Sequence, residues 1–218
     1  MRGLVTGFEA FAGLPTNPAA LLLPQLEREP VDGCDLVVAE LPVSLARTPD
    51  VLRGLVAAHR PDFVVALGLA RGAAVVRVET MAINAASFSV ADNDGVRPVE
   101  GALLEDDGAS GRAATWDAPA VVEAILAAGV PARLSFHAGT HLCNAALYAL
   151  LGLLAGRPVP CGFLHLPCLP EQVVWLLRRH EEQPGASQGI ASLSLPLQVA
   201  AVRAAIAVVA RQAALTLA

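Results

Sequence analysis

The chain of 218 residues is long enough for one domain with a substantial core, and 55% of its residues are hydrophobic. Its formal net charge of -5 comes without any cluster of basic residues, which argues against a nucleic-acid partner. All 15 basic residues are arginine, so chemistry that needs a lysine, such as a Schiff base or a phosphate-binding P-loop, is excluded.

The apolar C-terminal segment, residues 199–218, is the longest stretch that could suggest a membrane span. It contains Arg203 and Arg211, which favour an amphipathic helix packed on the domain. The apolar run at the N-terminus is too short for a signal peptide. Neither CxxC spacing nor the density of a disulfide framework is seen among the cysteines, which are Cys34, Cys143, Cys161 and Cys168. We therefore expect a cytoplasmic protein with no membrane partner.

Strand and helix signals alternate along the chain. Strands are expected at residues 2–8, 34–43, 62–70, 73–84, 132–139 and 159–167. Helices are expected at residues 19–27, 48–59, 118–129, 143–156, 170–182 and 199–218. Asn17 before Pro18, and Thr48 before Pro49, are typical of helix starts.

This alternation predicts an α/β fold, specifically a three-layer αβα domain with a largely parallel, mixed central sheet. The continuous apolar run at 62–70 is typical of a central strand covered on both faces. Residues 84–117 depart from the pattern because they are rich in Asp, Gly and Ser, and a functional loop or β-arm is expected there. We expect a single catalytic domain, residues 1–218, with its site beyond the carboxyl ends of the strands.

Three residues in this framework have the chemistry of a nucleophilic triad. Cys143 opens a predicted helix, where unpaired backbone N–H groups and the helix dipole favour a thiolate and could hold an oxyanion. His165 ends the next predicted strand and is the candidate base. Glu79 is a carboxylate within an apolar strand, where it needs a partner and could orient the histidine.

Each of the three also has a purely structural interpretation. Cys143 could be a small buried core residue, and His165 a core histidine with satisfied hydrogen bonds. Glu79 could form an ion pair with Arg77 or Arg71 instead. The residues alone leave these alternatives open.

A zinc site is a weaker alternative. His137 and His141 are four residues apart and Cys143 follows, but the Gly139–Thr140 break argues against one helical face, and no fourth ligand has the usual spacing. We therefore expect no metal site.

Five blocks of sequence resemble the pyroglutamyl-peptidase I family along nearly the whole chain: VTGFEAFAG, NPA at 17–19, VETMAIN, AGTHLCN and GFLHLPCLPEQ. The resemblance implies a cysteine exopeptidase that cleaves the amide bond after an N-terminal pyroglutamyl residue and needs no metal or organic cofactor. It also implies a cytosolic homo-oligomer, a tetramer or dimer, whose partners are peptides with N-terminal pyroglutamate.

The resemblance assigns roles residue by residue. Cys143 falls on the family nucleophile, His165 on its base and Glu79 on the residue that orients the base. Phe8 and Phe11 fall on aromatic positions that line the pocket for the lactam ring, and Leu69 and Leu142 complete the expected substrate-binding residues.

Two departures from the family pattern concern the substrate. Leu69 stands where many members have a glutamine that hydrogen-bonds the lactam, and Ser89 stands nearest to a family arginine close to the catalytic cysteine. Arg71 or Arg97 are candidates to replace the missing contacts. Two other functions stay open: a cysteine amidase with a different small acyl substrate, and a noncatalytic binding protein.

Overall fold

The computed structural model describes residues 1–29, 31–180 and 190–217, and its centre is a six-stranded sheet. The strand order is β2-β1-β3-β8-β4-β7. The bounds are β1 Arg2–Phe8, β2 Asp35–Leu41, β3 Phe63–Leu69, β4 Val76–Glu79, β7 Ala132–Ser135 and β8 Cys161–Leu166. All neighbours in the sheet are parallel except β4 and β8, which are antiparallel. The predicted largely parallel, mixed sheet is confirmed.

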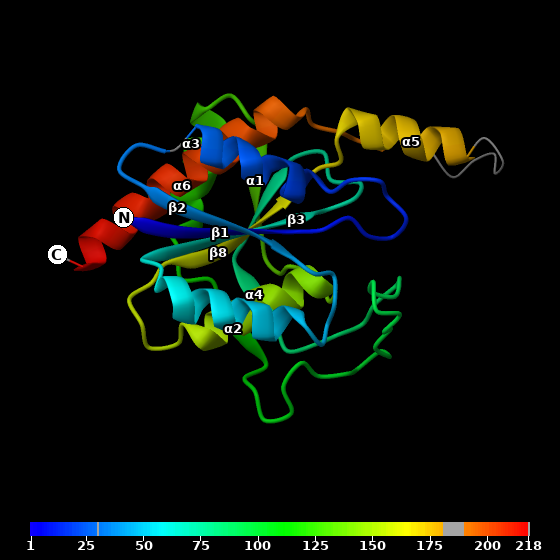
Figure 1. Ribbon diagram of the computed structural model, residues 1–218, viewed down its shortest axis with the longest axis horizontal. Coiled ribbons are helices and arrows are strands. Elements are labelled where there is room, and N and C mark those ends of the chain that lie inside the picture. The colour runs from blue at the N-terminus through cyan, green and yellow to red at the C-terminus, as the bar shows by residue number, and fades with distance from the viewer. Residues whose placement is uncertain (30, 181–189, 218) are drawn as a thin grey trace.

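Helices cover both faces of this sheet (Figure 1). One face carries α1 (Pro18–Arg28), α3 (Ala118–Ala127) and α6 (Leu195–Leu217), and the other carries α2 (Thr48–His59) and α4 (Leu142–Leu153). Each face encloses its own cluster of buried apolar side chains, so the predicted three-layer architecture is confirmed. The helix α5 (Pro170–His180) extends beyond the layers. Residues 181 and 182 of the predicted helix 170–182, and residue 218, lie outside the described residues.

The long helix α6 is apolar and long enough to cross a membrane, judged by length and composition alone. In this fold its apolar side packs against α3 and α1, and Val202, Ile206 and Val209 are fully buried there. The helix therefore packs on the domain and contributes to its core, as the two arginines within the apolar segment led us to expect.

The predicted single strand 73–84 is wrong, because the chain forms two strands in different sheets. β4 ends at Glu79, and β5 (Met81–Ile83) pairs with β6 (Gly111–Ala113) in a separate antiparallel sheet. The change of direction is at Thr80, whose N–H donates to the Ser135 carbonyl while its own carbonyl accepts from the Ala114 N–H. The 84–117 excursion thus contains β6 and returns to the main fold beside β4.

The predicted N-cap at Thr48 is also wrong. Thr48 is already the first helical residue of α2, and Arg47, which precedes it, makes no capping hydrogen bond through its side chain. The Thr48 hydroxyl instead donates to the Pro42 carbonyl. The cap predicted at Asn17 is correct, since its side chain accepts a hydrogen bond from the Ala19 N–H.

Candidate active site

Cys143 is the second residue of α4, one position further into the helix than the sequence suggested. His141 precedes the helix in an extended conformation and makes no side-chain cap. The N–H groups of the first turn are therefore not occupied by a capping side chain. A helix start whose N–H donors have no capping side chain favours negative charge, either on a thiolate or on an oxyanion.

Gly68, near the end of β3, leaves the space that the Cys143 sulfur occupies. A Cβ atom at Gly68 would lie 2.7 Å from Cys143 Sγ and 2.7 Å from Phe163 Cζ, closer than such atoms pack. Gly68 is also the residue in register with His165 across the parallel β3–β8 pair. The glycine thus allows the thiol to lie over the sheet beside the imidazole.

His165 and Glu79 form a buried pair on neighbouring strands. His165 Nδ1 lies 2.7 Å from Glu79 Oε1. Because β4 is antiparallel to β8, Glu79 pairs with Phe163 and is a diagonal neighbour of His165 on the same face of the sheet. Glu79 therefore pairs with His165, not with the Arg77 or Arg71 of the alternative interpretation. Glu79 Oε2 has no hydrogen-bond partner among the described residues.

The environment of His165 favours its protonated form. Burial by itself lowers the pKa of His165, but the neighbouring Cys143 and Glu79 outweigh burial and raise this pKa to about 9. A histidine whose protonated form is favoured, placed between a cysteine and a carboxylate, is an arrangement typical of cysteine nucleophiles.

The other three cysteines lie in different environments. Burial raises the pKa of the Cys161 thiol to about 12, and burial is also the main cause of the raised pKa values of Cys34 and Cys168. None of these three shifts has a histidine among its causes. Cys143 is the cysteine whose contacts suit nucleophilic chemistry.

A small pocket lies beside Cys143. Its lining is mostly apolar and consists of Phe8, Phe11, Asn17, Val43, Leu69, His141, Leu142 and Cys143. The structure therefore places all four expected substrate-binding residues in one pocket with Cys143. A flat, uncharged ring suits such an apolar, aromatic pocket.

Sequence analysis did not assign Asn17, Val43 or His141 to this pocket. Asn17 fixes the loop after β1, because its Nδ2 donates to the Glu9 carbonyl while its Oδ1 caps α1. Glu9 in turn accepts from the Val43 N–H through Oε1. Asn17 lies in the NPA block, and this motif could have indicated its place in the pocket. Nothing in the sequence around Val43 indicates that Val43 lines the pocket.

The segment that carries Ser89 adjoins this pocket through an aromatic contact. The rings of Phe88 and His141 have centroids 4.1 Å apart. Arg97 Nε donates to the Phe88 carbonyl over 2.9 Å, and Ser89 and Arg97 both line an open cavity of about 610 Å³. Of the two arginines considered as replacements, Arg97 is the one tied to this segment.

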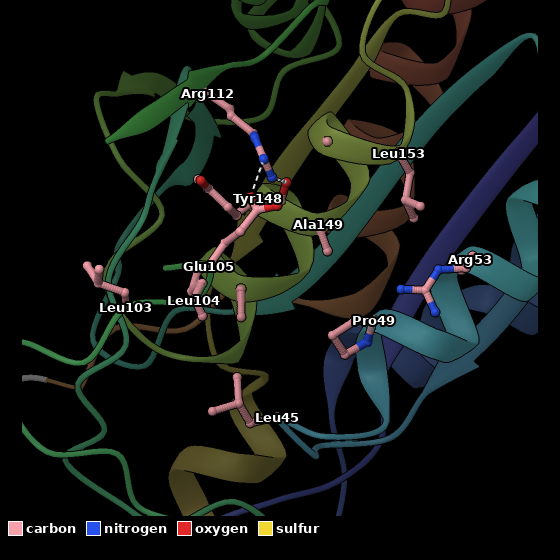
Figure 2. Close-up of a pocket in the computed structure, with 12 residues that line it drawn as sticks. Leu45, Pro49, Arg53, Leu103, Leu104, Glu105, Arg112, Tyr148, Ala149 and Leu153 are labelled. Carbon is pink, nitrogen blue, oxygen red and sulfur yellow. Dashed lines mark hydrogen bonds and ion pairs between the residues drawn. The ribbon is translucent and has the colours of Figure 1, made fainter. Parts of the chain in front are cut away.

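A different cavity, of about 470 Å³, lies among residues of α2, α4 and the 84–117 excursion (Figure 2). Its charged side chains are already paired, Arg112 with Glu105 and Arg53 with Asp50. None of the described residues that line it is a cysteine, histidine or serine. Although roomier, it lacks the groups for nucleophilic catalysis, so the pocket at Cys143 is the candidate active site.

The residues of the zinc alternative do not converge. The His137 ring accepts a hydrogen bond from the Gly139 N–H, whereas the His141 ring packs on Phe88 and Phe11. Within the described part of the chain, no group of three or more His, Cys, Asp or Glu side chains is placed to hold a metal ion.

Comparisons with known proteins agree on one family. The family model described as pyroglutamyl peptidase matches residues 1–212. A pyrrolidone-carboxylate peptidase of Cupriavidus taiwanensis is 38% identical, over 94% of this chain and 90% of its own, and one of Gloeobacter violaceus is 39% identical over 80% and 85%. The crystal structure of pyroglutamyl peptidase I from Bacillus amyloliquefaciens aligns with a TM-score of 0.86 and 28% identity, covering 96% of this chain and 97% of that one. A mutant pyrrolidone carboxyl peptidase from Pyrococcus furiosus aligns with a TM-score of 0.90 and 28% identity, covering 98% and 100%.

Proposed function

The chain belongs to the pyroglutamyl peptidase family and is a hydrolase of peptides with an N-terminal pyroglutamyl residue, and we propose that Cys143, His165 and Glu79 are its catalytic triad. The observation that carries the proposal is the buried contact of 2.7 Å between His165 Nδ1 and Glu79 Oε1. Cys143 neighbours the same histidine and, with Glu79, raises its pKa. This is the nucleophile, base and orienting carboxylate of acyl transfer.

The triad acts in two steps. The Cys143 thiolate attacks the carbonyl that joins pyroglutamate to the next residue, and backbone N–H groups at the start of α4 hold the oxyanion. Protonated His165 gives its proton to the leaving amine as the C–N bond breaks, which leaves a thioester on Cys143. The neutral imidazole then takes a proton from water, which attacks the thioester and releases pyroglutamate and the free thiol.

The pocket accounts for exopeptidase specificity. Phe8, Phe11, Leu69 and Leu142 surround the space beside Cys143, and the pocket is small. A pyroglutamyl ring has no charged amino group, so an apolar pocket can bury it without leaving a charge unpaired. A longer acyl chain would have no room behind the ring.

A panel of N-acyl aminomethylcoumarins tests the acyl preference directly. The expected result is release of coumarin from the pyroglutamyl compound at a kcat/KM at least about tenfold above the prolyl and acetyl compounds, because their shape or polarity fits the pocket less well. Higher activity on another acyl group would favour the alternative amidase. No turnover of any compound, with iodoacetamide labelling Cys143 no faster than a free thiol, would favour a noncatalytic binding protein.

Gly68→Ala is expected to lower kcat on the pyroglutamyl compound by about tenfold or more. The new Cβ atom would overlap Cys143 Sγ and Phe163, so the thiol must move away from His165. Gly54→Ala is the matched control, because a Cβ at that helical position meets nothing within 4 Å. A Gly68→Ala enzyme with unchanged kcat would contradict the packing argument.

We further propose that residues 1–218 form one catalytic domain in a cytoplasmic homo-oligomer. All four cysteines are free thiols, as is usual in a reducing compartment, and this supports the location. Exposed Val174 and Leu177 on α5, and Val99 and Leu103 in the excursion, supply apolar surface for subunit contacts. Light scattering after size-exclusion chromatography measures the assembly, and a monomer at all concentrations would end the oligomer proposal.

A further inference from the structure

We propose that His141 Nδ1 accepts a hydrogen bond from the lactam N–H of the substrate and thereby sets the preference for pyroglutamate. The inference rests on the proposed function, because it places the lactam ring in the pocket beside Cys143. It names a polar contact that Leu69 cannot supply.

The ring of His141 is held in place at the pocket wall. Its centroid is 4.1 Å from that of Phe88 and 5.6 Å from that of Phe11, with both pairs of rings tilted. His141 also lines the same pocket as Cys143 and Leu69. Contacts with two aromatic side chains restrict the orientation of this ring and therefore the positions of its nitrogen atoms.

The hydrogen bonding of this ring selects one tautomer. His141 Nε2 lies 3.1 Å from the Val90 carbonyl oxygen, which can only accept, so Nε2 carries the proton. Burial lowers the pKa of His141, despite the Val90 carbonyl and Asp92, which act in the opposite sense, and therefore favours the neutral ring. In a neutral ring protonated at Nε2, Nδ1 is an acceptor. Among the described residues nothing donates to His141 Nδ1.

The other side chains of the pocket leave this role open. The lining side chains without any hydrogen-bond acceptor are Phe8, Phe11, Val43, Leu69 and Leu142. Asn17 is engaged at both ends, with Oδ1 on the Ala19 N–H and Nδ2 on the Glu9 carbonyl. A buried lactam N–H without an acceptor would weaken binding. Among the described side chains that line this wall, His141 Nδ1 is an acceptor to which no donor is bound.

The test compares two substrates that differ at one ring position. Pyroglutamyl-aminomethylcoumarin has the lactam N–H, and 3-oxocyclopentanecarbonyl-aminomethylcoumarin keeps the ring carbonyl but has CH₂ in place of N–H. The unmodified enzyme should favour the lactam by about tenfold or more in kcat/KM. His141→Phe keeps an aromatic ring without an acceptor, so it should lose this preference through slower lactam turnover, with the ketone analogue unaffected.

His141→Asn is the rescuing variant, because the asparagine Oδ1 can occupy the place of His141 Nδ1. It should retain a clear part of the lactam preference. A His141→Phe enzyme that keeps the full preference for the lactam would overturn the proposal. A His141→Asn enzyme that has a normal melting temperature but no preference for the lactam would overturn it as well.

Calorimetry on inactive protein separates this inference from the triad. Pyroglutamyl-alaninamide should bind Cys143→Ala protein about tenfold more tightly than Cys143→Ala/His141→Phe protein, whatever the mechanism of turnover. Equal affinities would overturn the role of His141. Retained turnover in Cys143→Ala alone would instead count against the triad.

Discussion

Cys143→Ser is expected to lower kcat on pyroglutamyl-aminomethylcoumarin by about 10³-fold or more under reducing conditions. A serine hydroxyl can occupy the space over Gly68 but is not ionised by a neighbouring imidazolium, so the ion-paired nucleophile is lost. Because the side chain hardly changes in size, the melting temperature should stay close to that of the unmodified protein. Fluorescence of the released coumarin and a thermal melt measure the two quantities.

Cys34→Ser is the matched control for this experiment. Cys34 is a partly buried free cysteine that lies in the other apolar layer, and burial raises the pKa of its thiol. Its replacement should leave kcat and KM unchanged. Undiminished turnover in Cys143→Ser would end the thiol mechanism, whereas activity lost equally in both variants would indicate damage to the fold.

Glu79→Gln is expected to lower kcat/KM by about 10²- to 10⁴-fold and to move the alkaline limb of the pH profile to lower pH. Glu79 is one of the two groups that raise the pKa of His165 to about 9. Above this pKa the imidazolium loses the proton that the leaving amine requires, so the rate of the unmodified enzyme should fall near pH 9. Removing the carboxylate lowers the pKa of His165, so the fall should begin at lower pH.

The measurement is kcat/KM on the coumarin substrate from pH 5 to 10, with Asp35→Asn as control. Asp35 is an exposed carboxylate that pairs with Arg2 at the start of β1 and β2. Its removal should change neither the rate nor the profile. A Glu79→Gln profile whose alkaline limb stays near pH 9 would contradict the role of Glu79, even if the enzyme were slower.

Local sequence was sufficient for most of the framework. The continuous apolar run at 62–70 predicted the central strand β3, and Asn17 with Pro18 predicted the start of α1, because these signals act over a few residues. The position of Cys143 at a helix start was equally local. Specific blocks around Cys143 and His165 then indicated the family, which the comparisons show.

Only the tertiary structure decided which groups meet. Glu79 had three possible partners in sequence, and the antiparallel pairing of β4 with β8 made His165 its diagonal neighbour. Residues 73–84 were predicted as one strand because no turn residue interrupts them. In the structure the backbone hydrogen bonds of Thr80 with Ser135 and Ala114 divide this segment into two strands. These pairings are set by chain segments far apart in sequence.

The pocket shows the same division between sequence and fold. The family motifs pointed to Phe8 and Phe11, whereas Val43 and His141 reach the pocket from loops that only the packed sheet brings together. The sequence by itself determined the layers, the helix that carries Cys143 in its first turn and the reaction class, since each depends on short-range pattern or motif. The partner of Glu79, the space over Gly68 and the polar wall at His141 were decided by the fold, because a hydrogen bond or a steric fit depends on atoms within a few ångströms, whatever their separation along the chain.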